Sequence, residues 1–587
     1  MFDTVLVANR GEIALRVMRA CKELGLRTVA VYSEADRDAL HVAYADDAYL
    51  IGGAAASESY LRGDAIVAAA QRAGAQAIHP GYGFLAENAA FASACEDAGL
   101  VFIGPPASAM ERMGGKTAAR REALAAGVPV VPGTTEPIDD LGQMASVAAD
   151  LGYPVAIKAV AGGGGRGFRV VASPAALDEA FASARREALA GFGNADVYLE
   201  RYMPDPRHIE IQILADVYGN VIHLGERECS VQRRHQKLIE ECPSPVLGAA
   251  LRAEMGAAAV RLAAAVGYVG VGTMEFIFQD GAWFFLEMNT RIQVEHPVTE
   301  MVTGVDLVHA QIRVARGERL WLRQEEIVWR GHAIECRINA EDAAAGFRPA
   351  LGTIGGYSEP SGYGVRVETA ARAGTVISPY YDSLIAKLIC WADDRQAAIA
   401  RMRRALADYT IEGVTTTLGF HRLALAHAAF ARGDTTVNFI PRYLADSLAE
   451  LAAATAVVPG EPAAGRRFSV EVDGRRMEVR VAEIGAAAPT PPLNARRGPG
   501  GARGGVAGGT AARLHSAGAI VAPLQGTVRA VNVANGASVA AGQVLCVIEA
   551  MKMENEVVAP RDGTLARVLA RVGQTVEAGA MLAEYAN

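Results

Sequence analysis

Lysine, paired cysteines and long apolar segments are all scarce in this 587-residue sequence. Only six of its 57 basic residues are lysine and the others are arginine; the six are Lys22, Lys116, Lys158, Lys237, Lys387 and Lys552. Lysine is a compact point charge and an acylable amine, whereas arginine is a planar fork. Chance retention is the alternative for any single lysine, but the few that remain are expected to be enriched where arginine cannot serve.

The other absences exclude whole classes of protein. The seven cysteines include no CxxC pair, which argues against a disulfide framework or a zinc site and fits a reducing cytosol. The net charge of −8 lacks the basic excess of a nucleic-acid-binding protein. No charge-free apolar run reaches the roughly 20 residues that a bilayer requires, and the opening MFDTVLVANR lacks the basic region of a secretory signal. We therefore expect a cytoplasmic protein of about four domain-sized units, without a membrane or nucleic-acid partner.

The local patterns predict an α/β start and a flexible connection near the end. An apolar strand at residues 5–8 precedes a helix over 12–24 and a second strand at 28–31. The turn between them is NRGE rather than the GxGxxG of a dinucleotide site, so a structural α/β fold is favoured. Alternation around Asp473-Gly474 predicts a hairpin over 468–481. Residues 486–512 are expected to be a linker, because 19 of these 27 residues are Ala, Gly or Pro.

The C-terminal region contains an internal repeat. Residues 522–528 (APLQGTV) match 559–565 (APRDGTL) at an offset of 37, and several glycines and apolar residues recur at the same offset. Such a period predicts two similar β units related by a pseudo-twofold axis. Lys552, within the segment EAMKMEN, lies between the two copies and is therefore expected at a hairpin tip.

Two features in the middle of the chain indicate nucleotide and metal chemistry. Lys158 ends a predicted strand and precedes the segment AVAGGGGRG, whose backbone N–H groups could approach phosphate oxygens closely; a plain flexible loop is the alternative. Glu275, Glu287 and Asn289 stand in apolar, strand-like runs and are the hard oxygen donors that Mg²⁺ takes. Buried carboxylates are costly unless they bind metal or pair with cations, so structural ion pairs are the alternative there.

These motifs resemble those of two known families. The segment EAMKME looks like the biotinyl-lysine motif of biotin carboxyl carrier domains; a lipoyl domain, which has the same fold, is the nearest competitor, and an ordinary exposed lysine is the third interpretation. Residues 1–446 are similar to biotin carboxylases through ANRGEIA at 8–14, HPGYG at 79–83 and GHAIECRIN at 331–339. The whole chain resembles the α subunit of a bacterial acyl-CoA carboxylase. Residues 447–517 are shorter than the partner-docking region of propionyl- and methylcrotonyl-type subunits, so the actinobacterial acetyl/propionyl type is more similar.

The resemblance implies a fold class and a domain order. The fold class is α/β and α+β, a biotin carboxylase with an ATP-grasp fold, followed by an all-β flattened barrel. The expected domains are an N-terminal α/β domain at 1–115, an ATP-grasp domain with a glycine lid at 116–330, a C-terminal biotin carboxylase domain at 331–446, a connector with a hairpin at 447–485, a linker at 486–517 and a carrier domain at 518–587.

The resemblance also implies a reaction and roles for single residues. Biotin on Lys552 would be carboxylated with ATP, bicarbonate and Mg²⁺ or Mn²⁺. The implied ATP-binding residues are Lys116, Lys158, Gly163, Gly164, Glu200, Met203, His208 and His235, although either histidine could instead satisfy a loop backbone. The metal ligands would be Glu275, Glu287 and Asn289. Arg291, Gln293 and the Val294 backbone would orient bicarbonate and Glu295 would be the general base. Lys237 and Arg291 would hold the carboxyphosphate intermediate, and Arg337 would stabilise the biotin enolate.

The implied partners are a separate carboxyltransferase β subunit, which transfers the carboxyl group to an acyl-CoA, and a transiently bound biotin protein ligase. Arg16, Arg19 and Glu23 share a face of the first helix that contributes to a homodimer in this family; a solvated charged face is the alternative. Two other interpretations stay open. One is the matching component of a pyruvate or other oxo-acid carboxylase, and the other is an ATP-grasp ligase that uses no biotin.

Overall fold

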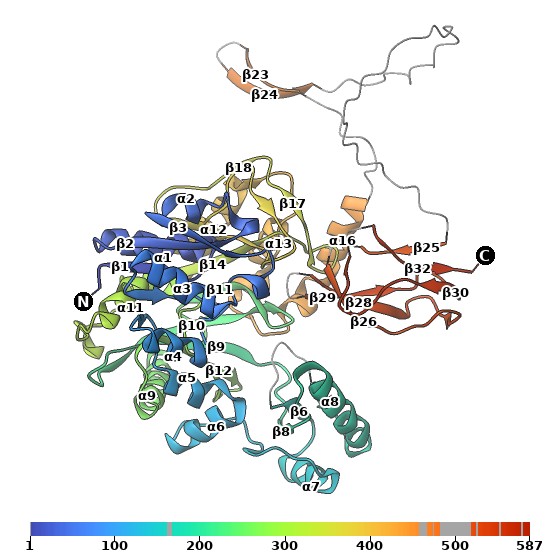
Figure 1. Ribbon diagram of the computed structural model, residues 1–587, viewed down its shortest axis with the longest axis horizontal. Coiled ribbons are helices and arrows are strands. Elements are labelled where there is room, and N and C mark those ends of the chain that lie inside the picture. Colours follow the sequence, from blue (N-terminus) through green and yellow to red (C-terminus); the bar gives the residue numbers. More distant parts are fainter. Residues whose placement is uncertain are drawn as a thin grey trace. The chain divides into compact units, whose positions relative to one another are not determined.

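The computed structural model describes residues 2–160, 167–456, 466–472, 475–481, 518–523, 526–550, 553–576 and 579–586. Its chain divides into two compact units, the first formed by Met1–Leu448 with Glu549–Asn555 and the second by Ala449–Ile548 with Glu556–Asn587. Figure 1 shows the helices and strands of both. Gly163, Gly164, Lys552 and the expected linker at 486–512 lie outside the described residues. Within the described ranges, no helix combines the length and the apolar character needed to cross a bilayer.

The first unit begins with a parallel sheet of order β3-β2-β1-β4-β5. The strands are β1 (Thr4–Val7), β2 (Arg27–Ser33), β3 (Asp47–Gly52), β4 (Ala77–His79) and β5 (Val101–Phe102), and the helices are α1 (Gly11–Glu23), α2 (Leu40–Tyr44), α3 (Gly63–Ala73), α4 (Ala89–Asp97) and α5 (Ala107–Gly114). Val5 and Val7 pack into one hydrophobic cluster and Leu6 into another, as expected for a sheet that is covered on both faces. The predicted β-α-β unit is confirmed, with bounds that differ by one or two residues.

A small three-stranded sheet of order β7-β6-β8 follows. Its elements are β6 (Val155–Ala159), β7 (Phe168–Val171), β8 (Val197–Arg201), α6 (Lys116–Ala125), α7 (Leu141–Leu151) and α8 (Leu177–Phe192). Residues of α7, α8 and the three strands share one hydrophobic cluster, which includes Met144, Ile157 and Phe181. This subdomain therefore has a core of its own.

The largest sheet is antiparallel and has the order β13-β12-β9-β10-β11-β14-β21-β19. Its strands are β9 (Arg207–Ala215), β10 (Val221–Arg233), β11 (Gln236–Cys242), β12 (Gly270–Gln279), β13 (Ala282–Asn289), β14 (His332–Asn339), β19 (Val365–Thr369) and β21 (Leu384–Ala392). The helices around it are α9 (Ala249–Ala265), α10 (His296–Thr303), α11 (Leu307–Ala315), α12 (Arg395–Asp408), α13 (Leu418–Ala426), α14 (Ala428–Arg432), α15 (Phe439–Tyr443) and α16 (Ala445–Ala456). Because β11 pairs with β14, the sheet runs through the boundary expected near residue 330.

The second unit contains two four-stranded sheets, of orders β25-β32-β30-β27 and β29-β28-β26-β31. The strands are β25 (Ala519–Val521), β26 (Gly526–Val531), β27 (Ser538–Val539), β28 (Val544–Ala550), β29 (Met553–Val558), β30 (Gly563–Val568), β31 (Thr575–Val576) and β32 (Met581–Tyr585). The hydrogen bond from Val528 N to Gln574 O has its counterpart, 37 residues on, from Leu565 N to Ala537 O. The predicted pseudo-twofold repeat is therefore confirmed, as is the predicted fold class of both units.

The hairpin expected over 468–481 is present as β23 (Arg466–Val472) and β24 (Arg475–Val481). The two strands are antiparallel, with Val472 opposite Arg475. Asp473 and Gly474, which are expected to form the turn, lie outside the described residues.

Candidate functional site

One face of the eight-stranded sheet is polar although it is buried. On β9, His208, Glu210 and Gln212 alternate with isoleucines that pack into a hydrophobic cluster. Alternate strand residues point to opposite faces, so the apolar set anchors the strand and the polar set faces away from that core. Most of the polar side chains discussed below come from this sheet or from the loop that leads from β13 to α10.

The expected metal ligands are brought together by strand pairing. Glu275 of β12 lies directly opposite Glu287 of β13, and Thr273 lies opposite Asn289. Burial and then the charge of Glu275 raise the pKa of Glu287. The charge of Glu275 thus disfavours ionisation of Glu287, and two facing carboxylates with an amide side chain beside them suit a hard divalent cation such as Mg²⁺. In this structure the oxygens of Glu275 contact protein groups instead, including Asn289 Nδ2 at 2.8 Å and His208 Nε2 at 3.0 Å.

Positive side chains expected to bind ATP also converge. Burial, followed by the charge of Lys158, lowers the pKa of His235, and His208 and Lys116 contribute to the same shift. Burial lowers the pKa of Lys116 as well, with Lys158 adding to the effect and Glu287 opposing it. The charge of Lys158 thus disfavours the protonated forms of Lys116 and His235, and a polyanionic ligand such as a triphosphate would favour them.

The remaining expected ATP contacts lie near β8. Glu200 of that strand is buried and accepts hydrogen bonds from Lys158 and, at 3.3 Å, from Arg120. Met203 follows the strand and is half-buried. His235 and its neighbour Arg234 form the turn between β10 and β11 with φ values of +66° and +49°. Non-glycine residues rarely adopt this backbone, and such conformations cluster at functional sites.

Glu295 lies between two cations. One carboxylate oxygen accepts from Lys237 Nζ at 2.8 Å and the other from Arg337 Nη2 at 2.8 Å. Burial alone would raise the pKa of Glu295, but the charges of Lys237 and Arg337 outweigh it and hold the pKa well below its ordinary value. Glu295 is therefore ionised at neutral pH. Lys237 also contacts Glu275 at 3.0 Å, so a single ammonium links the expected general base to the expected metal site.

The loop before Glu295 presents the expected bicarbonate-binding groups. The Arg291 guanidinium is oriented by Glu87 Oε2 and by Asn289 Oδ1, both at 2.8 Å. Gln293 donates to Glu275 Oε1 at 2.8 Å and accepts from Arg227 Nη2 at 2.6 Å. These contacts fix the side chains of Arg291 and Gln293 in the loop that leads to Glu295. A guanidinium and an amide offer the paired donors that a planar anion requires.

Several residues of this network were not predicted from the sequence: Glu87, Glu210, Arg227, Glu240 and Lys387. Glu210 contacts Lys237 and receives two hydrogen bonds from Arg227, and all three side chains are buried or nearly so. Glu240 accepts from Arg337 Nε at 2.6 Å. The alternation of polar and isoleucine residues on β9 could have identified Glu210. Lys387 is one of the six lysines named above, but no sequence motif gives it a role.

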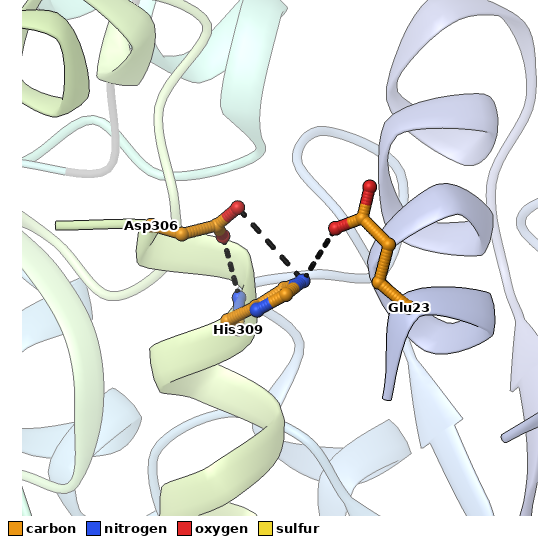
Figure 2. Close-up of side chains that lie close together, drawn as sticks. All are labelled: Glu23, Asp306 and His309. Atoms are coloured by element: carbon orange, nitrogen blue, oxygen red, sulfur yellow. Dashed lines mark hydrogen bonds and ion pairs between the residues drawn. The ribbon is translucent and has the colours of Figure 1, made fainter. Parts of the chain in front are cut away.

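A separate cluster joins α1 to α11. Figure 2 shows His309 between Glu23 and Asp306, with its Nε2 atom 2.9 Å from Glu23 Oε2 and 3.9 Å from Asp306 Oδ2. Arg16 of the same α1 face is buried and pairs within the chain with Asp306 at 2.7 Å and Glu300 at 3.0 Å. Arg16 is therefore not part of a solvated face, whereas the side chains of Arg19 and Glu23 are 44% and 63% exposed.

Comparisons with known protein families find four domain matches along this chain. Residues 1–110 match the biotin carboxylase N-terminal domain, 115–323 the ATP-binding domain of the carbamoyl-phosphate synthase L chain, 335–442 the biotin carboxylase C-terminal domain and 517–585 the biotin-requiring enzyme domain.

Individual relatives are similar over the first unit. A biotin carboxylase of Nostoc sp. is 56% identical over 75% of this chain and 98% of its own length, and a pyruvate carboxylase subunit of Methanothermobacter thermautotrophicus is 55% identical over 76% and 90%. The biotin carboxylase domain dimer of Hydrogenobacter thermophilus 2-oxoglutarate carboxylase, solved with MgADP, ADP and bicarbonate, is 51% identical and superposes with a TM-score of 0.73 over 75% of this chain and 98% of that one. This chain belongs to the biotin carboxylase family, and it continues into a C-terminal domain of the biotin-requiring enzymes.

Proposed function

We propose that the first unit carboxylates biotin with ATP and bicarbonate and that Lys552 is the residue to which the biotin is attached. The observation that carries the proposal is the position of Glu295 between Lys237 and Arg337, beside the facing carboxylates of Glu275 and Glu287. Glu295 removes the bicarbonate proton, and Arg291, Gln293 and the Val294 backbone orient the anion. Arg337 stabilises the developing negative charge on biotin.

The nucleotide is bound at the converging basic residues. Lys116, Lys158, Glu200, Met203 and His208 hold ATP, and His235 and the glycine loop at Gly163 and Gly164 cover it. Glu275, Glu287 and Asn289 would hold Mg²⁺, which would supply positive charge beside the ATP phosphates. Lys237 and Arg291 hold the carboxyphosphate that results.

We propose that the final acceptor is an acyl-CoA, either acetyl-CoA or propionyl-CoA. A separate carboxyltransferase β subunit transfers the carboxyl group to it. Support comes from the union of carboxylase and carrier domains in one chain and from the short region between them. An oxo-acid acceptor is the second candidate, because two of the relatives described above belong to a pyruvate carboxylase and to a 2-oxoglutarate carboxylase. The exposed side chains of Arg19 and Glu23 support a homodimer face on α1, and a biotin protein ligase is the expected transient partner.

The test uses the purified full chain with ATP, Mg²⁺ and free biotin. We expect ADP release that depends on bicarbonate and biotin, together with streptavidin reactivity of the chain. Lys552→Arg keeps the positive charge but removes the acylable amine, so it is expected to lose streptavidin reactivity and retain the free-biotin reaction. Undiminished streptavidin reactivity in the variant would overturn the role of Lys552, and ADP release without bicarbonate dependence would overturn the carboxylase assignment. Adding candidate β subunits with acyl-CoA or oxo-acid acceptors then distinguishes the two acceptors.

A further inference from the structure

Lys387 is a charged residue in an otherwise apolar strand, and the reaction described above gives it no role. Strand β21 reads LIAKLICWA, and the Lys387 side chain is completely buried. Burying an ammonium is costly unless it is paired and hydrogen-bonded. In a chain whose basic residues are nearly all arginine, this is one of only six lysines.

The ammonium joins three segments that are distant in sequence. Its Nζ atom donates to the Val294 carbonyl at 3.1 Å and pairs with Glu12 Oε1 of α1 at 3.1 Å. The Tyr82 hydroxyl donates to the same Glu12 oxygen, and its ring lies 5.8 Å from Nζ. Strand β21, helix α1 and the loop before α10 are thus held by a single charge.

The contact with Val294 fixes a backbone that is expected to bind substrate. The Gln293 carbonyl accepts from His296 Nδ1 at 2.8 Å, and the Val294 carbonyl accepts from Lys387. Because peptide units are planar, these two contacts set the planes on both sides of Val294. The direction of the Val294 N–H follows from the first plane, and the position of Glu295 follows from the second.

Strand register places Lys387 beside Arg337. The two residues are direct cross-strand partners in β21 and β14, so their side chains share a face of the sheet. Arg337 holds the Glu295 carboxylate at 2.8 Å, and Lys387 holds the carbonyl of the preceding residue. Neighbouring cations thereby hold consecutive residues of the loop, one through its side chain and the other through its backbone.

We propose that Lys387, with Glu12 as its counter-ion, is a positioning residue that orients the Val294–Glu295 backbone for bicarbonate. The proposal rests on the proposed function of this site. It predicts a specific loss of bicarbonate binding, because the cations expected to hold ATP are on other elements.

The experiment compares the full-length variants Lys387→Met and Lys387→Met/Glu12→Gln in the free-biotin assay. The single variant leaves the Glu12 carboxylate buried without its cation, so its melting temperature is expected to fall. The double variant removes that unpaired charge and should recover most of the melting temperature. Both variants are expected to raise the KM for bicarbonate by roughly tenfold to a hundredfold, the range for loss of a charge-assisted hydrogen bond, and to leave the KM for ATP within about twofold.

A merely structural role predicts a different result, in which the KM for bicarbonate recovers together with the melting temperature in the double variant. That result, or an unchanged KM in either variant, would overturn the proposal. Lys22→Met is the matched control, since Lys22 lies at the surface and donates to the Tyr44 carbonyl at 2.8 Å; it should leave both KM values unchanged. A wild-type chain without bicarbonate-dependent ADP release would overturn the proposed function itself and is measured before any variant.

Discussion

Charged side chains in this site are held by two or three contacts each with side chains of the opposite charge. Glu295 is the clearest case, because its two oxygens contact different cations and it is only 2% exposed. Lys237 likewise contacts Glu210, Glu275 and Glu295. Such a network keeps each group in one orientation before substrate arrives, which is the condition for effective acid–base and electrostatic catalysis.

Glu295→Gln is expected to lower bicarbonate-dependent ADP release by roughly 10²–10⁴-fold, the usual contribution of a general base. Glutamine keeps the size of the side chain and one oxygen acceptor, so the KM for ATP should change little. Steady-state kinetics of the full chain with free biotin give both quantities. Glu341→Gln is the control, because it alters an equally buried carboxyl in β15 (Glu341–Asp342) and should keep turnover close to that of wild type. Near-normal turnover of Glu295→Gln would show that another group removes the bicarbonate proton.

The sequence predicts candidate site residues where a motif contains them, and it misses contacts that only the fold supplies. Glu275 and Glu287 were found because charges interrupt apolar strands. Glu87 was not, since it reaches Arg291 across 204 residues of chain through a contact that has no local pattern. The roles of Glu295 and Arg337 came from resemblance, and the structure adds that they contact each other.

At the level of elements, β11 connects the site to helix α12 and to strand β14. Glu240 on this strand contacts Arg337, and the adjacent Glu241 accepts from Arg395 of α12 at 2.6 and 3.0 Å and from His332 of β14 at 2.8 Å. The pairing of β11 with β14 could not be predicted, because register between strands so far apart in sequence is set by burial rather than by a local turn. The repeat at 522–565, in contrast, predicts the pseudo-twofold symmetry correctly, because the same sequence pattern occurs twice.

Glu241→Gln is expected to reduce the stability of the first unit at neutral pH by about 3 kcal/mol, an amount that follows from the pKa shift of the buried carboxyl. Burial would raise the pKa of Glu241, but the hydrogen bond from His332 and the charge of Arg395 lower it to about 2. A carboxyl whose pKa is lowered by folding stabilises the protein at pH values above the pKa that it has in the unfolded chain. This contribution disappears as the pH falls toward about 2, the pKa of the carboxyl in the folded protein. The difference between wild type and variant should therefore shrink over that acidic range.

Urea unfolding of the full chain at several pH values, followed by fluorescence, measures this difference. Glu318→Gln serves as the control, because it breaks an exposed pair with Arg313 and should cost less than about 1 kcal/mol at any pH. A deficit in Glu241→Gln that is the same at acidic and neutral pH would show that the charge of Glu241 does not contribute to stability.

At the scale of the whole molecule, the residues expected to carry out the carboxylation lie between Lys116 and Arg337, whereas the expected biotin lysine, Lys552, is more than 200 residues further along the chain. The 27-residue segment 486–512, rich in Ala, Gly and Pro, is expected to connect them as a flexible chain with a span of about 30 Å. At full extension it reaches no more than about 95 Å. In the proposed reaction, biotin on Lys552 would visit both the site near Glu295 and the acceptor site of a separate transferase, so the length of this segment would limit how far the carrier domain can move.

Removing half of residues 486–512 is therefore expected to slow the coupled reaction with the β subunit far more than the free-biotin reaction, which requires no movement of the carrier domain. The measurement compares acyl-CoA carboxylation by the reconstituted complex with bicarbonate-dependent ADP release by the same variant on free biotin. A segment of the original length with its residues shuffled is the control, because it keeps composition and span and should retain both rates. Equal slowing of both reactions would mean that the deletion damages the carboxylase unit. A carboxylated acyl-CoA formed by the chain without any β subunit would show that a transferase site lies within these 587 residues.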